Sequence, residues 1–301
     1  MNTIRAVFCM LAFWAGSAVA QPPQVVTDIA PVQSLAARVM EGAGSPSVIL
    51  RPGESPHRRA LRPSEAAALA GADLVLWIGP ELMPWFESTL DRLAPDARQI
   101  ALLDHADTLR RPVRDGALFA GEEAEDAHDG TDPHAWLDPA NARAWLPLIA
   151  EALATLDPDN ATLYRQNAKD GAAEIAALED RIAVQLARFG STGFLVSHDA
   201  FQYFEFRFGT FANGALSGSD DQPPSAARLK TLRDAVAEAG ISCVLAEPQT
   251  DPRLLETVLP GSETRVARID LMGSGLPAGA GLYPALIGGL AQTLADCLAG
   301  S

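Results

Sequence analysis

Short apolar runs alternate with helical patterns along almost the whole chain, and this alternation limits the available folds most strongly. The apolar runs have the length of buried strands, and they are Val25–Ile29, Ser47–Leu50, Leu74–Ile78, Ile100–Leu103, Gly193–Ser197, Ser242–Ala246 and Arg265–Ile269. Helical stretches lie between them, for example Ser64–Ala70, Trp85–Leu93 and Ser225–Ala239. Strands that alternate with helices are typical of mainly parallel sheets flanked by helices, so we predict an α/β fold.

A long amphipathic segment separates the two groups of strands. It begins at Asp157-Pro158, which offers an N-cap acceptor and a proline in the first turn. A continuous helix from Pro158 to Arg188 would be about 46 Å long, which is longer than one small domain needs. We therefore predict a rigid linking helix, residues 157–189, between an N-terminal lobe (21–156) and a C-terminal lobe (190–301). Two helices broken at Gly171 are the alternative.

The first twenty residues have the pattern of a cleaved signal peptide. Arg5 supplies the positive charge, Ala6–Ala15 is a short apolar core, and Ser17-Ala18-Val19-Ala20 ends in small residues. We expect cleavage near Ala20-Gln21, export to a bacterial periplasm, and no contribution of residues 1–20 to the fold.

Export simplifies the interpretation of the cysteines. Cys9 belongs to the signal peptide, which leaves Cys243 and Cys297 in the mature chain. Two cysteines in an oxidising compartment suggest one disulfide, and two unrelated buried thiols are the alternative.

The charged residues exclude some partners. The formal net charge of −15 argues against nucleic acid and against an anionic membrane surface. Six acidic residues lie in the segment 111–131, which has three glycines and little periodicity. We expect this acidic segment to be a mobile loop of the N-terminal lobe.

Three of the five histidines lie in turns beside predicted strands or helices. They are His57, His134 and His198; the other two are His105 and His128. Three imidazoles with an open or oxygen-filled fourth position suit Zn²⁺. The chain has no local metal motif, so the fold would have to assemble the site, and scattered capping or surface histidines remain the alternative.

The residues around these histidines match a recurring set of segments, in order, through nearly the whole mature chain. The segments are Ser55–Ser64, Ala72–Glu81, Asp132–Pro139, Leu156–Ala161 with Tyr164 and Asn167, Ser197–Phe204 with Phe208-Gly209, Pro224-Ser225, and Ala246–Gln249. In them the chain resembles the zinc/manganese solute-binding proteins of ABC transporters (cluster A-I), and the zinc-binding branch in particular.

This resemblance implies two lobes joined by a long backbone helix, with the metal held between them by His57, His134 and His198. Asp270 or water would complete the coordination, since Pro56 stands where some zinc relatives have a glutamate. In the manganese-binding relatives the position of His198 resembles a carboxylate position, so nitrogen there favours Zn²⁺.

The resemblance also bears on three features outside the ligand set. The zinc relatives share the pair Cys243 and Cys297, which favours the disulfide. Glu247 either orients a ligand histidine or pairs with an arginine. The acidic segment retains only His128, so we expect it to be a solvated loop rather than a collector of metal.

We therefore expect a periplasmic protein, not an enzyme, that captures one Zn²⁺ per chain as its transported ligand and delivers it to an ABC-transporter permease. It would be a monomer, with a periplasmic metallochaperone as a further candidate partner. The rival hypotheses are an exported His₃ zinc hydrolase and a manganese or iron solute-binding protein of the same fold.

Overall fold

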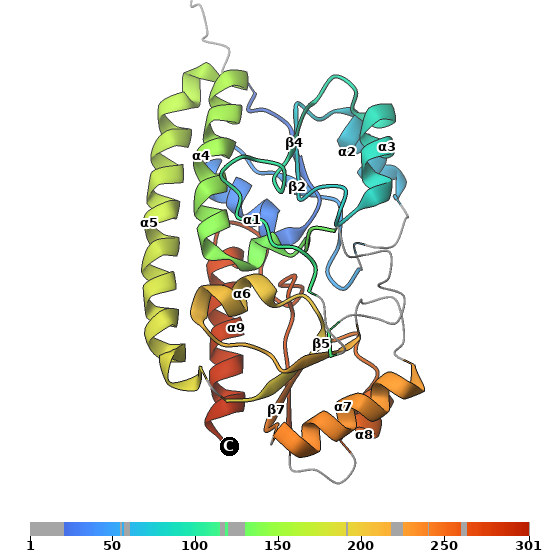
Figure 1. Cartoon of the computed structure of the whole chain (residues 1–301). Helices are drawn as coiled ribbons and strands as arrows, with labels where there is room; N and C mark the ends of the chain where they lie inside the picture. Colours follow the sequence, from blue (N-terminus) through green and yellow to red (C-terminus); the bar gives the residue numbers. More distant parts are fainter. Residues whose placement is uncertain are drawn as a thin grey trace, which may run out of the picture.

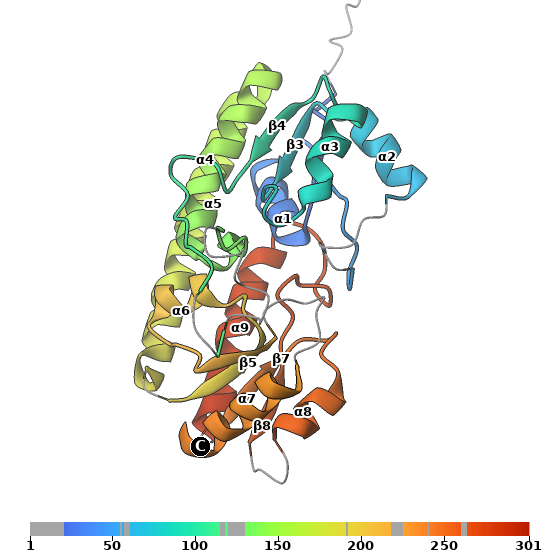
Figure 2. The ribbon, with the colours of Figure 1, turned by 45° about the vertical axis from the view of Figure 1, so that its right-hand side comes forward.

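The computed structural model describes residues 21–54, 56, 61–114, 118–119, 130–190, 192–217, 225–239, 241–259 and 264–300. These residues form two four-stranded parallel sheets flanked by helices (Figures 1 and 2). The first sheet has the order β2-β1-β3-β4 and the second the order β6-β5-β7-β8, so the two halves repeat one topology. The predicted α/β fold with two parallel sheets is confirmed; the predicted signal peptide lies outside the described residues.

The inner strands match the predicted apolar runs because they are covered on both faces, whereas β4 begins two residues earlier than predicted. Their bounds are β1 Val25–Thr27, β2 Ser47–Val48, β3 Leu74–Trp77, β4 Arg98–Ala101, β5 Phe194–His198, β6 Gly214–Ser217, β7 Cys243–Ala246 and β8 Arg265–Arg268. Every residue of β3, β5 and β7 is buried, whereas β4 and β8, at the sheet edges, are largely exposed. A strand covered by helices on both faces is a continuous apolar run, as these are.

Strand β6 escaped the sequence prediction because it is built from small residues. Gly214 is needed there: a Cβ at this position would lie 2.9 Å from the carbonyl oxygen of Leu118. That carbonyl accepts a hydrogen bond from the backbone N of Ala215 (2.8 Å). Residues of the acidic segment therefore lie along the edge of the second sheet.

Several helices begin at the proline and aspartate residues that predict a helix start. Their bounds are α1 Ala30–Val39, α2 Pro63–Ala70, α3 Pro84–Leu93, α4 Pro139–Leu156, α5 Ala161–Leu186, α6 Gln202–Phe208, α7 Ala226–Ala239, α8 Pro252–Val258 and α9 Leu282–Ala299, with 3₁₀ turns η2 Ala135–Leu137, η3 Pro158–Asn160 and η4 Ala187–Phe189. The side chains of Asp138 and Asp251 cap α4 and α8 by accepting backbone N–H groups. Asp157 instead accepts from Asn160 and Tyr164 across the η3 turn.

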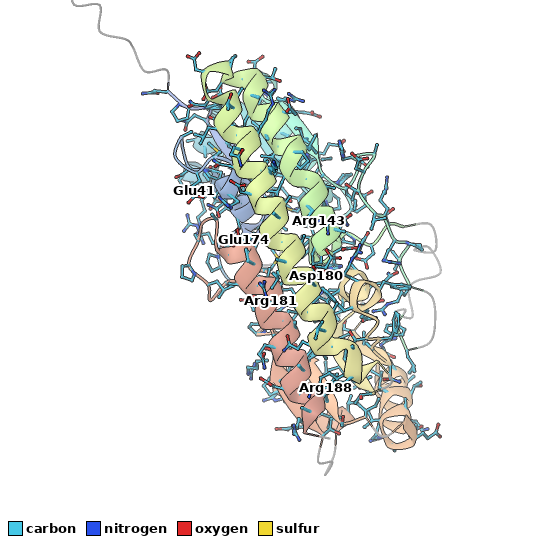
Figure 3. The ribbon with its side chains drawn as sticks, turned by 90° about the vertical axis from the view of Figure 1, so that its left-hand side faces the viewer. Glu41, Arg143, Glu174, Asp180, Arg181 and Arg188 are labelled. Carbon is cyan, nitrogen blue, oxygen red and sulfur yellow. A yellow bond between two sulfur atoms is a disulfide. The ribbon has the colours of Figure 1, made fainter. Side chains whose placement is uncertain are left out.

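The linking helix is continuous, and the broken-helix alternative is wrong. Helix α5 runs for 26 residues, and the turns η3 and η4 extend it at both ends. Gly171 lies inside it because α1 approaches closely: a Cβ there would be 2.9 Å from Cγ of Arg38. The outer face of α5 carries exposed charges, including Glu174, Asp180 and Arg181 (Figure 3).

Helix α9 and the core join the two halves of the molecule. Helix α5 packs against α1 and α4 of the first half and against α9, and α9 contacts α1 as well as β7 and β8 (Figure 3). By length and composition α9 could cross a membrane, but its apolar side chains are buried in the core. One hydrophobic cluster includes Val25 and Leu74 of the first sheet and Leu245 of the second.

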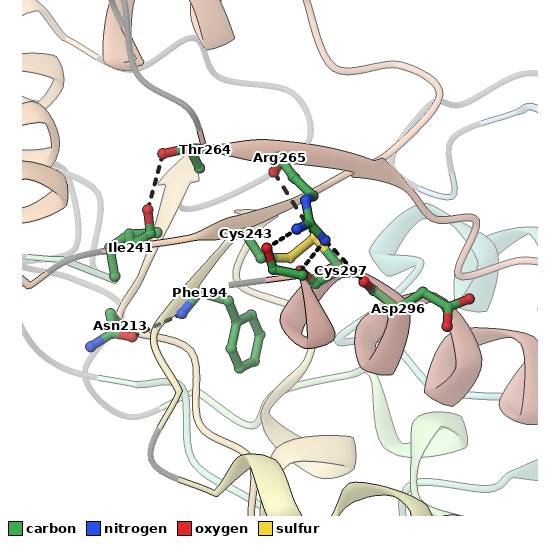
Figure 4. Close-up of a disulfide and its surroundings, with 9 residues drawn as sticks. Phe194, Asn213, Ile241, Cys243, Thr264, Arg265, Asp296 and Cys297 are labelled. Atoms are coloured by element: carbon green, nitrogen blue, oxygen red, sulfur yellow. Dashed lines mark hydrogen bonds between the residues drawn. A yellow bond between two sulfur atoms is a disulfide. The ribbon is translucent and has the colours of Figure 1, made fainter.

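Cys243 and Cys297 form the predicted disulfide, which ties the start of β7 to the end of α9 (Figure 4). Both cysteines are buried. Next to them the Arg265 guanidinium donates to the carbonyl of Gly300, as lysines and arginines do at helix C-termini. The last helix is therefore fixed to the second sheet by a covalent bond and a cap.

Candidate metal centre

His198 is the last residue of β5, at the point of the second sheet where an open α/β fold places ligands. In the order β6-β5-β7-β8, the chain passes from β5 to β6 on one side of β5 and then crosses to β7 on the other side. The carboxyl ends of β5 and β7 therefore border the point where the strand order reverses. Glu247 directly follows β7. The strand order therefore places the imidazole at the end of β5 beside the carboxylate that follows β7.

The two side chains are in direct contact. Oε1 of Glu247 accepts a hydrogen bond from Nδ1 of His198 and a second one from Oγ of Ser197 (2.8 Å). Gln249 donates its Nε2 to the other carboxylate oxygen (3.0 Å). With Nδ1 donating to a carboxylate, the tautomer of His198 has its lone pair on Nε2. Of the two roles considered for Glu247, orientation of a histidine is the one this geometry favours.

His134 is held in the same way by a carboxylate from its own turn. Oδ1 of Asp132 accepts from Nδ1 of His134 (2.7 Å) and also from its backbone N (2.9 Å). The η2 turn begins at the next residue, and Trp136 within it packs near the imidazole, with ring centroids 5.3 Å apart. Both hydrogen bonds fix the orientation of the ring, so the lone pair of His134 lies on Nε2 as well.

The two Nε2 atoms face each other at 3.4 Å. Both side chains are largely buried, with 8% and 5% of the residue surface of His134 and His198 exposed. In a tetrahedral zinc site with Zn–N distances of about 2.0–2.1 Å, two ligand nitrogens lie about 3.3–3.4 Å apart. Two lone pairs that converge at this separation are arranged as a pair of metal ligands is.

Among the residues that the structure describes, no further predicted ligand joins this pair. His57 and His128 lie outside them. Asp270 accepts backbone hydrogen bonds from Met272 (2.9 Å) and Gly275 (3.3 Å), so its carboxylate caps the turn after β8. His105 accepts from the backbone of Asp107 in a turn, as expected of an ordinary surface histidine. Residues 21–54, 56, 61–114, 118–119, 130–190 and the later described stretches contain no group of three metal-ligating side chains.

A buried ion pair lies next to the imidazoles. The guanidinium of Arg114 contacts Asp199, the residue after His198, with its Nε 2.8 Å from Oδ1. It also contacts Glu205, with Nη1 2.5 Å from Oε2. Burial raises the pKa of Glu205 to about 7, although the charge of Arg114 opposes this shift. Arg114 belongs to the acidic segment, so this end of the segment is attached beside the candidate ligands.

At the corresponding point of the first sheet, the carboxyl end of β1, a buried carboxylate is bonded to the backbone. Asp28 follows β1, is fully buried, and accepts from the backbone N of Ile29 and of Ile78, each at 2.7 Å. Burial raises the pKa of this carboxyl to about 7. Because both oxygens are bonded to the backbone, Asp28 has a structural role, and the chemistry-bearing point lies in the second sheet.

Asp132 is the functional residue that sequence reasoning did not identify. Its signal was present in Asp132-Pro133-His134, because an aspartate two residues before a histidine can reach the imidazole in a tight turn. We predict that Asp132→Asn weakens zinc binding by about 10–100-fold, the usual effect of removing a carboxylate that orients a ligand histidine. Competition against a chromophoric chelator measures this. Asp157→Asn is the matched control, because Asp157 is buried and hydrogen-bonded far from the imidazoles; equal affinities of the two variants would contradict the role of Asp132.

A protein family described as periplasmic zinc-uptake complex component A, ZnuA, matches residues 25–297. The chain belongs to this family. It is 42% identical over 322 residues to the high-affinity zinc uptake system protein ZnuA of Paracoccus denitrificans, with 98% of this chain and 99% of that protein covered. The ZnuA of Brucella abortus is 33% identical, with 99% of each covered.

Solved structures share the fold of this ZnuA-family chain. A crystal structure of ZnuA superposes with a TM-score of 0.78 at 24% identity, covering 92% of this chain and 99% of that one. The solute-binding protein FpvC of Pseudomonas aeruginosa, solved with Mn²⁺, gives a TM-score of 0.79 at 18% identity and covers 93% and 99%. These likenesses show that the fold is shared.

Proposed function

We propose that this protein is the periplasmic component of a zinc-uptake ABC transporter: it captures one Zn²⁺ per chain and delivers it to the membrane permease. The observation that carries the proposal is the buried pair of imidazoles with Nε2 atoms 3.4 Å apart. Membership of the ZnuA family supports it independently. In this proposal the signal peptide directs export and is cleaved near Ala20-Gln21, and the protein acts as a monomer.

The proposed ligands are His57, His134 and His198, with Asp270 or water in the fourth position. Nitrogen ligands on a small, buried site suit the borderline ion Zn²⁺, whereas Mn²⁺ prefers oxygen. The proposed lobes are residues 21–156 and 190–301, linked by residues 157–189. A periplasmic metallochaperone is a further proposed partner in loading.

The rival function, a zinc hydrolase, would need a general base beside the metal. The carboxylates of Asp132 and Glu247, which contact the imidazoles directly, are both bonded to Nδ1 atoms. They therefore orient ligands, which supports a protein that binds and releases zinc without catalysis.

Metal analysis and isothermal titration of the purified mature protein test the proposal directly. We expect one tightly bound Zn²⁺ per chain, weaker Mn²⁺ binding, and a higher melting temperature with zinc, because a ligand that binds only the folded state stabilises it. Hydrolysis assays with generic esters and peptides should show no zinc-dependent activity. Preferential Mn²⁺ binding, or zinc-dependent turnover, would contradict the proposal.

We predict that the acids of the acidic segment are dispensable for equilibrium zinc binding. The segment is closed at its base by an antiparallel bridge between Pro112 and Thr131, so its middle can change without moving His134. Replacing residues 121–129 by a Gly/Ser linker of equal length should leave the zinc Kd within about tenfold, which is roughly 1.4 kcal/mol. Titration of both proteins measures this, and a larger loss would make His128 or its neighbours ligands.

A further inference from the structure

The short helix α6 begins four residues after His198, and two of its side chains bond the residues that lead to His134. Nε2 of Gln202 donates to the carbonyl of Pro112 (2.9 Å) and to Oδ2 of Asp132 (3.2 Å). The hydroxyl of Tyr203 donates to the carbonyl of Asp132 (2.8 Å) and accepts from the backbone N of Arg111 (3.0 Å). Both side chains are buried, so these bonds are shielded from water.

Three further side chains of α6 contact the same part of the chain. Glu205 pairs with Arg114. Phe206 lies under the guanidinium of Arg111, 3.7 Å from ring centroid to Cζ. After His134, Arg207 forms a two-point contact with the carboxylate of Asp138, at 2.7 and 2.9 Å. Helix α6 therefore holds the chain both before and after His134.

The segment that α6 holds is itself a closed unit. The backbone N of Val113 donates to Gly130 (3.0 Å), and that of Asp132 donates to Arg111 (2.9 Å). These bonds flank the bridge between residues 112 and 131, so the two ends of the acidic segment are paired directly ahead of His134. The contacts with α6 therefore hold both ends of the acidic segment in place.

The turn that carries His134 is also bonded to residues near the C-terminus. Nε1 of Trp136 donates to the carbonyl of Leu271 (3.0 Å), and the hydroxyl of Tyr283 donates to the carbonyl of Trp136 (2.8 Å). Although His134 precedes the linking helix α5 in the sequence, its neighbours are bonded to residues that follow α5.

We propose that α6 fixes the turn of His134 to the C-terminal half, so that His134 and His198 form a preassembled two-imidazole half-site for the metal, with Tyr203 as the central positioning residue. The inference rests on the proposed zinc-binding function and assigns a role to residues that do not touch the metal. Fixing two ligands in advance removes part of the ordering that metal binding otherwise requires.

Tyr203→Phe tests the positioning role, because it removes only the hydroxyl that bonds two backbone groups. Tyr164→Phe is the matched control: the Tyr164 hydroxyl is also buried and donates to Asp157 (2.7 Å). We expect both variants to lower the melting temperature of the metal-free protein. Only Tyr203→Phe should weaken zinc binding, by about tenfold, and change the absorption bands of bound Co²⁺.

The outcomes separate this inference from the function on which it rests. If the wild type fails to bind zinc, the proposed function is wrong. If the wild type binds and both tyrosine variants bind zinc like it, with unchanged Co²⁺ spectra, α6 has only a structural role. Should Tyr203→Phe fold poorly, Gln202→Met gives the same test with a side chain of similar size, and wild-type affinity in that variant would equally overturn the inference.

A second measurement tests the half-site itself. His57→Ala should retain one-to-one zinc binding, weakened by about 100-fold, because the two imidazoles remain in place. Adding Tyr203→Phe to this variant should weaken the residual binding further by about tenfold. A loss in His57→Ala of at least about 1,000-fold, as large as we expect for the alanine variants of His134 and His198, would show that the pair alone is no half-site.

Discussion

Replacing either member of the imidazole pair by alanine should weaken zinc binding by at least about 1,000-fold, roughly 4 kcal/mol. Each substitution removes one nitrogen ligand, and it also leaves a carboxylate, Asp132 or Glu247, without the imidazole that it orients. The affinity is measured by competition with a chelator of known zinc affinity, with melting of the metal-free variants as a check on folding.

The other histidines supply the controls for this experiment. His105→Ala should bind zinc within about twofold of the wild type, because this imidazole contacts its own turn. His128→Ala should behave like it, because we expect the acidic segment to be a solvated loop. Wild-type affinity in both His134→Ala and His198→Ala would refute the site and remove the main support for zinc transport.

Removing the disulfide by the double change Cys243→Ser and Cys297→Ser should destabilise the protein by about 4 kcal/mol. The sulfurs join residues 54 positions apart, and closing a loop of this length in the unfolded chain accounts for about that much in the chain-entropy model. The melting temperature should fall by roughly 7 °C for a chain of this size. Calorimetry of oxidised wild type and variant measures the difference.

Zinc affinity should distinguish loss of stability from loss of the site. Cys243 is the first residue of β7, whereas Glu247 follows its last residue, so the bond lies at the opposite end of the strand from the imidazoles. At a temperature where the double variant is folded, its zinc Kd should match that of the wild type. A variant that melts like the wild type would show that the bond adds no stability.

Much of the fold is readable from the sequence because buried parallel strands are continuous apolar runs, as in β3, β5 and β7. Strand β4 lies two residues earlier than predicted, although Leu102 and Leu103 continue the backbone bonding to the neighbouring strand. Strand β6 begins with Gly214, which allows a close approach of the backbone of Leu118. This contact joins distant residues, so no local sequence pattern predicts it.

The site was partly predictable for a related reason. The positions of His134 and His198 in turns beside predicted elements single both of them out, and the resemblance to metal-binding proteins supports both as ligands. Glu247 and Asp132 act through pairwise geometry that depends on the packing of β7 against β5 and on one tight turn. The attachment of the His134 turn to α6 is a tertiary contact between distant residues, so periodicity and spacing carry no trace of it.

The helices α5 and α9, which pack on both halves, together with the shared core, have a consequence for how the ion leaves. A wide hinge opening would have to expose apolar side chains of one continuous cluster, so the metal-free and metal-loaded forms should have nearly equal radii of gyration in solution scattering. Dissociation is then limited by the breaking of coordination bonds, one after another, rather than by spontaneous gaping. We therefore expect the protein to retain its ion while it diffuses, and unloading to need another molecule that competes for the ligands.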